Sequence, residues 1–467
     1  MSLEPSILLS DYLVYLLVAF VVWGVLKLRS QRPLREAWKH VFSHSMSTVA
    51  FVVLLSYVAI TLLDSFHFQV RQNSSKGKSQ IATQKSLFDF IWEPLGEQDE
   101  KTYSAPFATR MFVKSLVMGK DGKEVRTYAP LKYAGLGLSA SYPRSLDILM
   151  RILKGIFWGL FISLTIIESL LLIGSRGDFQ TFKANNRKLY KGEGQIKWRS
   201  AALTFIVLFI FYACLYQVSR NYHIFGTSQI GQDILYRAIK SIRTGLLIGT
   251  LTTLFILPFS LVLGSVAGYF GGLVDDLIGY LYTTISSIPS VLLISASILV
   301  LQVYLNNHAD FFDTLEERAD ARLLILCLVL GLTSWAHLCR LLRGETLKIR
   351  ELSYIRAAKS LGTKPLKIIS SHILPNIMHI VLITMVIDFS GLVLAEAILS
   401  YVGVGVDPTT FSWGNMINSS RLELARQPIV WWPLASSLFF MFVLILSANI
   451  FADAVRDAFD PKLKNNR

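Results

Sequence analysis

The chain has few charged residues and lacks the common signatures of enzymes. Only 17% of its 467 residues are charged, whereas 52% are hydrophobic. The phosphate-binding pattern G-x-x-x-x-G-K-[ST] does not occur, so the chain cannot itself supply ATP hydrolysis. The patterns H-E-x-x-H and G-x-S-x-G are missing too, as is any His cluster with metal-ligand spacing. We therefore expect no catalytic residue, no metal site and no cofactor.

Cysteine is also scarce. Cys214, Cys327 and Cys339 all lie within or at the edge of apolar runs, without the spacing of a metal site. They are expected to be small buried hydrophobic residues.

Long apolar runs dominate what is present. The mean hydropathy is +0.47, above what a soluble core requires. About 20 consecutive apolar residues are needed to cross a bilayer. Pro258 and Pro289 interrupt two of the runs, which membrane helices tolerate. The candidate spans are nine: residues 12–27, 46–63, 152–174, 201–219, 243–268, 279–303, 323–341, 377–401 and 431–452.

The net charge of +14 is distributed unevenly. Lys and Arg gather in the connections 27–45, 175–199 and 340–367, whereas 304–322 is mainly acidic. By the positive-inside rule the three basic connections face the cytoplasm, so nine spans place the N-terminus outside and the C-terminus inside. The tail before the first run has no Lys or Arg, which agrees and argues against a cleavable signal peptide. This pattern favours a lipid bilayer as the partner of the positive charge, and not nucleic acid.

Residues 64–150 form a long polar insertion, and the topology places them outside the membrane. Long loops are translocated largely regardless of charge. A small folded domain and a loosely ordered loop are both open for this segment.

One polar stretch, "SYIRAAKSLGTKPLKIISSHILPNIM" (353–378), lies between two apolar runs. Gly362 is placed to end a short helix at positive φ, and Pro365 to begin the next one. Leu366, Ile369, Ile373 and Leu374 repeat at helical spacing and predict one apolar stripe. The pattern predicts a helix–turn–helix hairpin, although an amphipathic helix lying on anionic lipid would look similar.

The residues of this stretch resemble the cytoplasmic signature of bacterial ABC importer permeases. The matching positions are Ala357, Ala358, Gly362, His372, Leu374 and Pro375. Further blocks resemble the dipeptide and oligopeptide branch of that family: residues 225–249, with Gly226, Thr227, Gly231 and Asp233, and residues 267–276, 394–417 and 457–463. The resemblance covers roughly residues 200–463.

Two departures from the family pattern stand out. Arg356 occupies a position where the family usually has Glu, and Ser228 and Gln232 replace Asp and Arg. The positive charge of Arg356 is compatible with three arrangements. The ATPase groove is acidic at the matching point, the Arg356 side chain turns outward, or the second permease alone supplies the acidic contact. We favour the acidic groove, because Lys359 and its neighbours make the whole hairpin basic.

Two acidic residues lie within one predicted span. Asp388 and Glu396 are eight residues apart, about 12 Å along a helix and near one face. Such groups mark a water-lined path or fix packing by interhelical hydrogen bonds, and both roles are open. Glu168, in the third predicted span, favours the structural role.

The sequence thus predicts an all-α polytopic membrane protein, with a six-helix type I ABC importer permease core preceded by about three extra transmembrane helices and an extracytoplasmic insertion. The expected divisions are 1–63 for two N-terminal helices, 64–150 for the insertion, 151–199 for a third helix and basic loop, and 200–463 for the core with a coupling hairpin at 350–376.

The resemblance also implies partners and a place in the cell. These are a homologous second permease, two cytoplasmic ABC ATPase subunits that couple through Arg356 and the matched hairpin residues, and an extracytoplasmic solute-binding protein. The location implied is the bacterial inner membrane, and the cargo di- or oligopeptides or other small solutes. An ATP-independent secondary transporter or channel is the alternative, but neither inverted repeats nor a midplane ion site is visible. A polytopic membrane enzyme is disfavoured by the missing catalytic residues.

Overall fold

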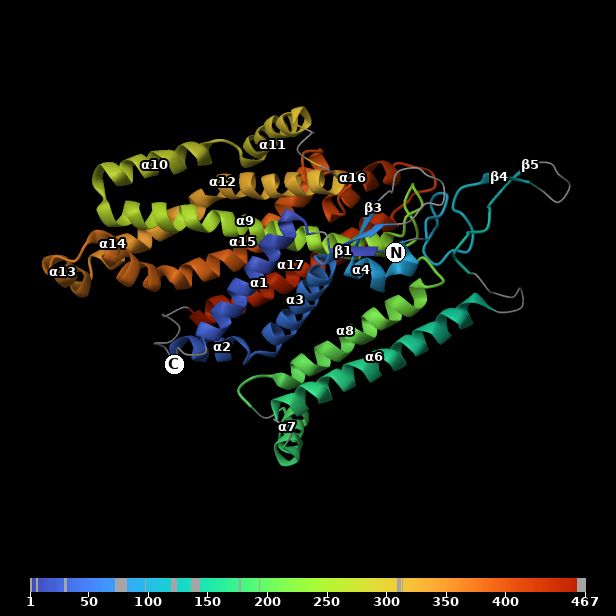
Figure 1. Cartoon of the computed structure of the whole chain (residues 1–467), viewed down its shortest axis with the longest axis horizontal. Helices are drawn as coiled ribbons and strands as arrows, with labels where there is room; N and C mark the ends of the chain where they lie inside the picture. Colours follow the sequence, from blue (N-terminus) through green and yellow to red (C-terminus); the bar gives the residue numbers. More distant parts are fainter. Residues whose placement is uncertain are drawn as a thin grey trace. The chain divides into compact units, whose positions relative to one another are not determined.

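The described residues are mainly helical, with two small antiparallel sheets and irregular connections (Figure 1). The computed structural model describes residues 2–5, 7–28, 32–71, 82–96, 98–118, 124–135, 143–175, 178–192, 194–308, 312 and 314–459. Long apolar segments become helices because hydrocarbon offers no partner to a backbone N–H or C=O, and a helix pairs these groups internally.

Within the described residues, eight helical segments are long and apolar enough to cross a membrane: α3 (Ser45–Asp64), α6 (Arg144–Gly174), α8 (Trp198–Ser219), α9 (Ile234–Phe270), α11 (Ser290–Asn307), α12 (Leu315–Arg350), the run Pro365–Val402, and α17 (Trp432–Phe459). In α1 (Leu9–Leu28), residues Leu9–Gly24 form a shorter apolar stretch. Each of the predicted spans overlaps one of these helices.

The candidate span at 279–303 is divided at Pro289, one of the two prolines that interrupt the apolar runs. The structure divides that region into α10 (Gly272–Ser287) and α11, because Ile288 is extended, with φ −87° and ψ 132°, and Pro289 caps the next helix. A residue before proline is pushed out of the helical region by the proline ring. Pro258, in contrast, lies inside the unbroken helix α9.

The residue contacts divide the chain into two compact units. Unit 1 comprises residues 1–7, 23–244 and 411–450, and unit 2 comprises residues 8–22, 245–410 and 451–467. The helices α1, α9 and α17 contribute to both.

Unit 1 contains both sheets. Strands β1 (Ser2–Pro5), β2 (His67–Arg71) and β3 (Ala82–Ser86) form one, with β2 in the centre, so the first residues of the chain pair with the segment that follows α3. Strands β4 (Ser115–Met118) and β5 (Glu124–Thr127) form a separate two-stranded ribbon. The insertion also contains the short helices α4 (Leu87–Ile91) and α5 (Glu93–Gly96).

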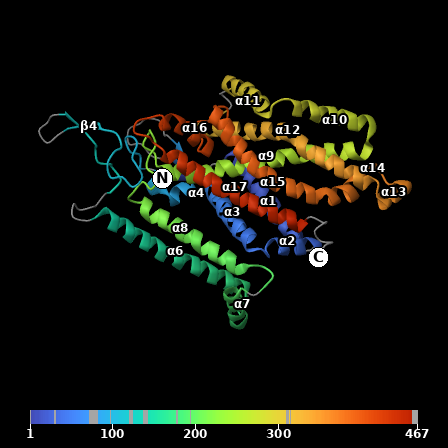
Figure 2. The same cartoon turned by 180° about the vertical axis from the view of Figure 1, so that it is seen from behind.

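The other helices of unit 1 are α2 (Arg32–Val41), α7 (Phe179–Lys191) and α16 (Trp413–Leu424). Helices α6 and α8 lie side by side in both views (Figures 1 and 2). A Cβ added at Gly155 would lie 2.6 Å from the Cα of Cys214, and one at Gly159 would lie 2.6 Å from the Cα of Ile210. The two glycines therefore permit the close approach of the helices, as small residues do in membranes.

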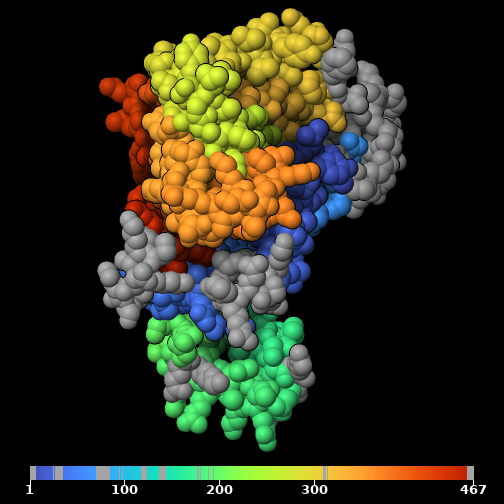
Figure 3. Space-filling model, turned by 90° about the vertical axis from the view of Figure 1, so that its left-hand side faces the viewer, coloured from blue at the N-terminus to red at the C-terminus, as the bar shows by residue number. Residues whose placement is uncertain are grey.

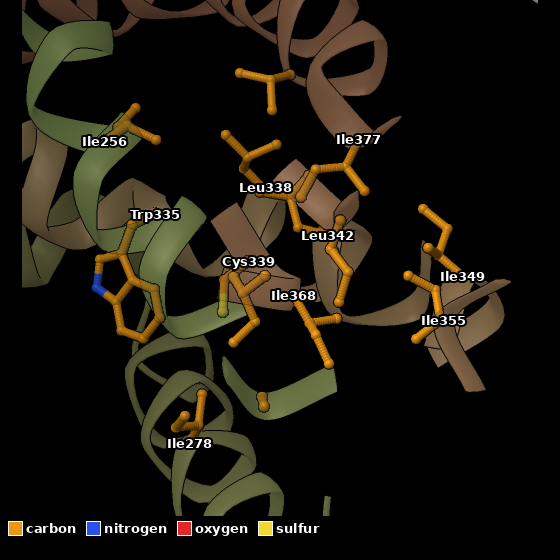
Figure 4. Close-up of a cluster of buried hydrophobic side chains, with 14 of the residues drawn as sticks. Ile256, Ile278, Trp335, Leu338, Cys339, Leu342, Ile349, Ile355, Ile368 and Ile377 are labelled. Carbon is orange, nitrogen blue, oxygen red and sulfur yellow. The ribbon is translucent and has the colours of Figure 1, made fainter. Parts of the chain in front are cut away.

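Unit 2 contains α10, α11, α12 and the run that begins with α13 (Ser353–Ser360) and α14 (Pro365–Ile368). A π-helical turn, η2 (Ile369–Ile373), joins α14 to α15 (Leu374–Val402). A buried apolar cluster of this unit gathers around Leu338, Cys339 and Leu342 of α12 (Figure 4). That cluster holds the polar hairpin in place, as described next.

Candidate functional site

The predicted hairpin is formed by α13 and α14. The N–H of Leu361 donates to the Ala357 carbonyl at 3.0 Å, and the N–H of Thr363 donates to the Ala358 carbonyl at 3.1 Å. Gly362 has φ +76°, and Pro365 stands in the first turn of α14. The turn therefore depends on a backbone conformation that glycine adopts without steric cost.

Four isoleucines anchor the hairpin. Ile355, Ile368, Ile369 and Ile373 are buried in the apolar cluster with residues of α12 (Figure 4). Leu366, which the sequence pattern places on this stripe, is instead 73% exposed. The π-helical turn η2 explains the difference, because its wider turn rotates the residues before it by about one position.

The outer surface of the hairpin combines apolar and basic side chains. Leu361 is 85% exposed, and Lys359, Lys364 and Lys367 are exposed beside it. Figure 3 looks onto this surface, drawn in orange. The hairpin thus presents Leu361 together with positive charge on its outer surface.

The other matched residues have defined positions. Ala357 and Pro375 are exposed, whereas Ala358, His372 and Leu374 are half-buried. The side-chain amide of Asn376 donates to the His372 carbonyl at 2.7 Å and to the Tyr354 hydroxyl at 3.1 Å, and so links the start of α15 to α13.

Arg356 has an acidic partner within the chain. Its guanidinium lies 3.0 Å from the Glu351 carboxylate, and Glu351 also accepts from Arg350 at 3.3 Å. Both Arg356 and Glu351 are more than half exposed, so the pair contributes less than about 1 kcal/mol. A docking protein can therefore separate it at little cost.

The two acidic residues of α15 have different surroundings. Glu396 is buried and accepts a hydrogen bond from the Ser400 hydroxyl at 2.7 Å, which suits a role in packing. Asp388 is half-buried. The structure therefore distinguishes two groups that the sequence pattern treats alike.

Residues 225–233, before α9, form a loop that carries the four family-motif residues, the motif loop. This loop is hydrogen-bonded to the insertion. The N–H of Ser104 donates to the Thr227 hydroxyl at 2.7 Å, and that hydroxyl donates to the Thr102 carbonyl at 2.9 Å. Gly226 has φ +67° and Gly231 has φ +83°. A Cβ at Gly231 would lie 1.7 Å from the Glu100 carbonyl oxygen, so this glycine permits backbone contact as well as the turn.

Asp233, the last of the four motif residues, belongs to a buried charged group. Its carboxylate lies 2.7 Å from Nδ1 of His223, whose Nε2 lies 3.7 Å from the Glu100 carboxylate. Glu100 also accepts the N–H groups of Lys132 and Tyr133 at 2.9 Å and 2.8 Å. Burial alone would lower the pKa of His223, but the two carboxylates overcome it and raise that pKa to about 9. The imidazole is therefore charged at neutral pH.

A second charged group joins α4 to α9. The Lys240 ammonium lies 2.6 Å and 2.8 Å from the two oxygens of Asp89 and 3.8 Å from Asp64, and the Tyr236 hydroxyl donates to Asp89 at 2.6 Å. Burial would raise the pKa of Asp89, but Lys240 lowers it below its usual value. A third link runs from the Tyr103 hydroxyl to Glu423 of α16, at 3.1 Å.

Sequence reasoning missed these contacts. Glu100 and His223 are far apart in the chain, and no motif spacing relates them. The one available signal was the position of His223, three residues before Gly226. Among the described residues, no group of three or more His, Cys, Asp or Glu side chains could hold a metal ion.

The helices, the hairpin and the motif loop define a polytopic membrane permease. Residues 260–465 match the family described as "Binding-protein-dependent transport system inner membrane component". The dipeptide transport system permease protein DppC of Alkalihalophilus pseudofirmus is 30% identical over 243 residues, which cover 52% of this chain and 73% of that protein. The chain therefore belongs to this family.

One more relative and one solved structure are similar to parts of the chain. The oligopeptide transport system permease protein OppC of Bacillus subtilis is 28% identical over 242 residues, covering 52% of this chain and 72% of that protein. A solved structure of the MetNI methionine ABC transporter, in an inward-facing conformation, has a TM-score of 0.37 at 14% identity and covers 49% of this chain and 98% of that one.

The His223 group predicts a pH-dependent stability. Because its pKa in the folded protein, about 9, exceeds the ordinary 6.5, its contribution is complete below pH 6.5 and is lost as pH rises through 9. At pH 7, His223→Gln should lower the free energy of unfolding by about 3 kcal/mol, because it leaves the carboxylates of Glu100 and Asp233 buried without a cation. At pH 10 most of the difference from wild type should vanish. Thermal unfolding of the purified chain at both pH values measures this.

His308→Gln is the matched control, because His308 is not buried and its ring nitrogen bonds to the Tyr304 carbonyl of the preceding helical turn, with no carboxylate among the contacts described for that ring. An equal difference between wild type and His223→Gln at pH 7 and pH 10 would contradict the assignment.

Proposed function

We propose that the chain is the transmembrane permease of an ATP-driven importer for di- or oligopeptides or related small solutes. The observation that carries the proposal is the hairpin of α13 and α14, anchored by four buried isoleucines and exposing Leu361 and Leu366. The relatives named for oligopeptide and dipeptide transport support the cargo class.

ATP hydrolysis is assigned to two separate cytoplasmic ATPase subunits. The permease pairs with a homologous second permease, and a solute-binding protein delivers the cargo from outside the bacterial inner membrane. When the ATPase dimer closes on ATP, it moves the hairpins and thereby shifts the populations of inward- and outward-facing states. Arg356 and the matched residues Ala357, Ala358, Gly362, His372, Leu374 and Pro375 are proposed to form or support this coupling surface.

Reconstitution tests the function. We expect the chain, joined with the second permease and the ATPase subunits in liposomes, to import a labelled dipeptide or oligopeptide only with ATP and the solute-binding protein present. The ATPase subunits should also copurify with the tagged chain. Uptake that follows an ion gradient without ATP would show a secondary transporter instead.

We also propose that the insertion and the N-terminus lie outside the cytoplasm and the C-terminus inside. The pairing of β1 with β2 supports a common side for the N-terminus and the segment after α3. Lys114 is exposed on the insertion. In a variant without the native cysteines, Lys114→Cys should react with a membrane-impermeant maleimide in intact spheroplasts. Labelling that requires lysis would reverse the topology.

The hairpin turn gives a test of coupling. Gly362→Val meets no neighbouring atom within 4 Å, so its effect is confined to the backbone. Positive φ costs a β-branched residue about 1–2 kcal/mol, which should distort the turn. The variant should insert normally but lose most of the transport-stimulated ATP hydrolysis of the reconstituted complex.

Gly344→Val is the matched control, because Gly344 likewise has open space around it and lies within α12 at ordinary helical φ. Stimulation in Gly362→Val equal to that of the control would show that the turn geometry is not required.

A further inference from the structure

The helices α6 and α8 pack mainly on each other, and α8 also touches α3. In the most apolar stretch of each, 11% of the residues are buried, compared with 33% in α3. Their outer sides are apolar and exposed, including Phe157 and Phe161, and Glu168 of α6 is exposed as well. Within unit 1, therefore, α6 and α8 form a peripheral hairpin.

The chain enters and leaves this hairpin at one point. The N–H of Gly135 donates to the carbonyl of Asn221 at 2.9 Å. The hydroxyl of Tyr222 donates to the carboxylate of Asp147, near the start of α6, at 2.9 Å. The segment between Gly135 and Asn221, which contains α6 and α8, thus begins and ends at residues that are hydrogen-bonded to each other.

The rest of unit 1 is held together by contacts that do not involve α6 or α8. The Tyr57 hydroxyl of α3 donates to the Phe440 carbonyl of α17 at 2.9 Å. Asp64, at the end of α3, faces Lys240 of α9. From there the insertion leads directly to the motif loop, where the backbone N–H of Glu100 donates to the Gly231 carbonyl at 3.0 Å.

We propose that α3, and not α8, is the first helix of the six-helix permease core, and that residues 136–220 are a membrane hairpin inserted into the loop between α3 and α9. The core then consists of α3, α9, α10 with α11, α12, α14 with α15, and α17. The number of extra helices is unchanged, but two of them lie within the first extracytoplasmic loop and present their outer faces to lipid. The expected division at residue 200 is replaced by this one.

The proposal predicts that the hairpin of α6 and α8 can be removed. Replacing residues 136–220 by a Gly-Ser-Gly linker spans ends that are already in hydrogen-bonding distance. In the reconstituted complex we expect less than about a threefold loss of import rate, since α3 loses its contacts with α8 but keeps those with α17 and α9. The shortened chain should insert, copurify with the ATPase subunits and melt cooperatively. A shortened chain that inserts but neither binds the ATPase nor imports would overturn the proposal.

Two matched substitutions in the full chain decide the question if the shortened chain fails to insert. Gly159→Leu separates α6 from α8 and should leave import intact, whereas Ala50→Leu, at a buried position of α3, should reduce it at least tenfold. The opposite pattern, or equal loss in both, would contradict the proposal.

The import readout rests on the proposed function, so the two failures must be distinguishable. A full-length chain that imports nothing would refute the proposed function alone. Insertion and melting of the shortened chain, and the melting temperatures of Gly159→Leu and Ala50→Leu, would then still test the assignment of α3.

Discussion

A backbone N–H or C=O without a hydrogen-bond partner in hydrocarbon costs several kcal/mol, and this constraint orders the whole chain. Several of the described segments that are not helical lie at the end of a long helix: strand β2 after α3, the motif loop before α9, and the residues between α12 and α13. At the Pro289 break, in contrast, a helix resumes at the next residue. Segments with irregular backbone and a functional role are therefore expected at the ends of helices.

Glycine makes two kinds of contact possible at those ends and within the helices. At Gly231 it supplies positive φ and the space for the Glu100 carbonyl together. At Gly155 and Gly159 it supplies space alone, between two helices whose φ values are ordinary. At Gly362 it supplies positive φ alone, since nothing lies nearby. A substitution thus has a different physical consequence at each, although all are glycines in a membrane protein.

The sequence predicted the helices and the hairpin well because apolar length and the Gly362–Pro365 pair are local signals. It failed where a local signal competes with another. Leu366 has the right spacing for the buried stripe, but the π-helical turn, which no residue pattern announces, exposes it and buries Ile368. The contacts of Glu100 with His223 and of Asp89 with Lys240 could not be predicted, because they join segments separated by more than one hundred residues.

These distant charge groups explain how a polar insertion can be fixed to a membrane protein without a large core of its own. A small buried apolar cluster of the insertion gathers around Met111 and Leu131. Charges at Lys240, Asp89 and Asp64 would be costly to bury singly, but each compensates another. Separating Lys240 from Asp89 would leave a charge without its partner in a largely buried place, which favours a single position of the insertion on α9. Together with the contacts of Glu100, His223 and Asp233, these pairs join the insertion to the loop that carries Asp233.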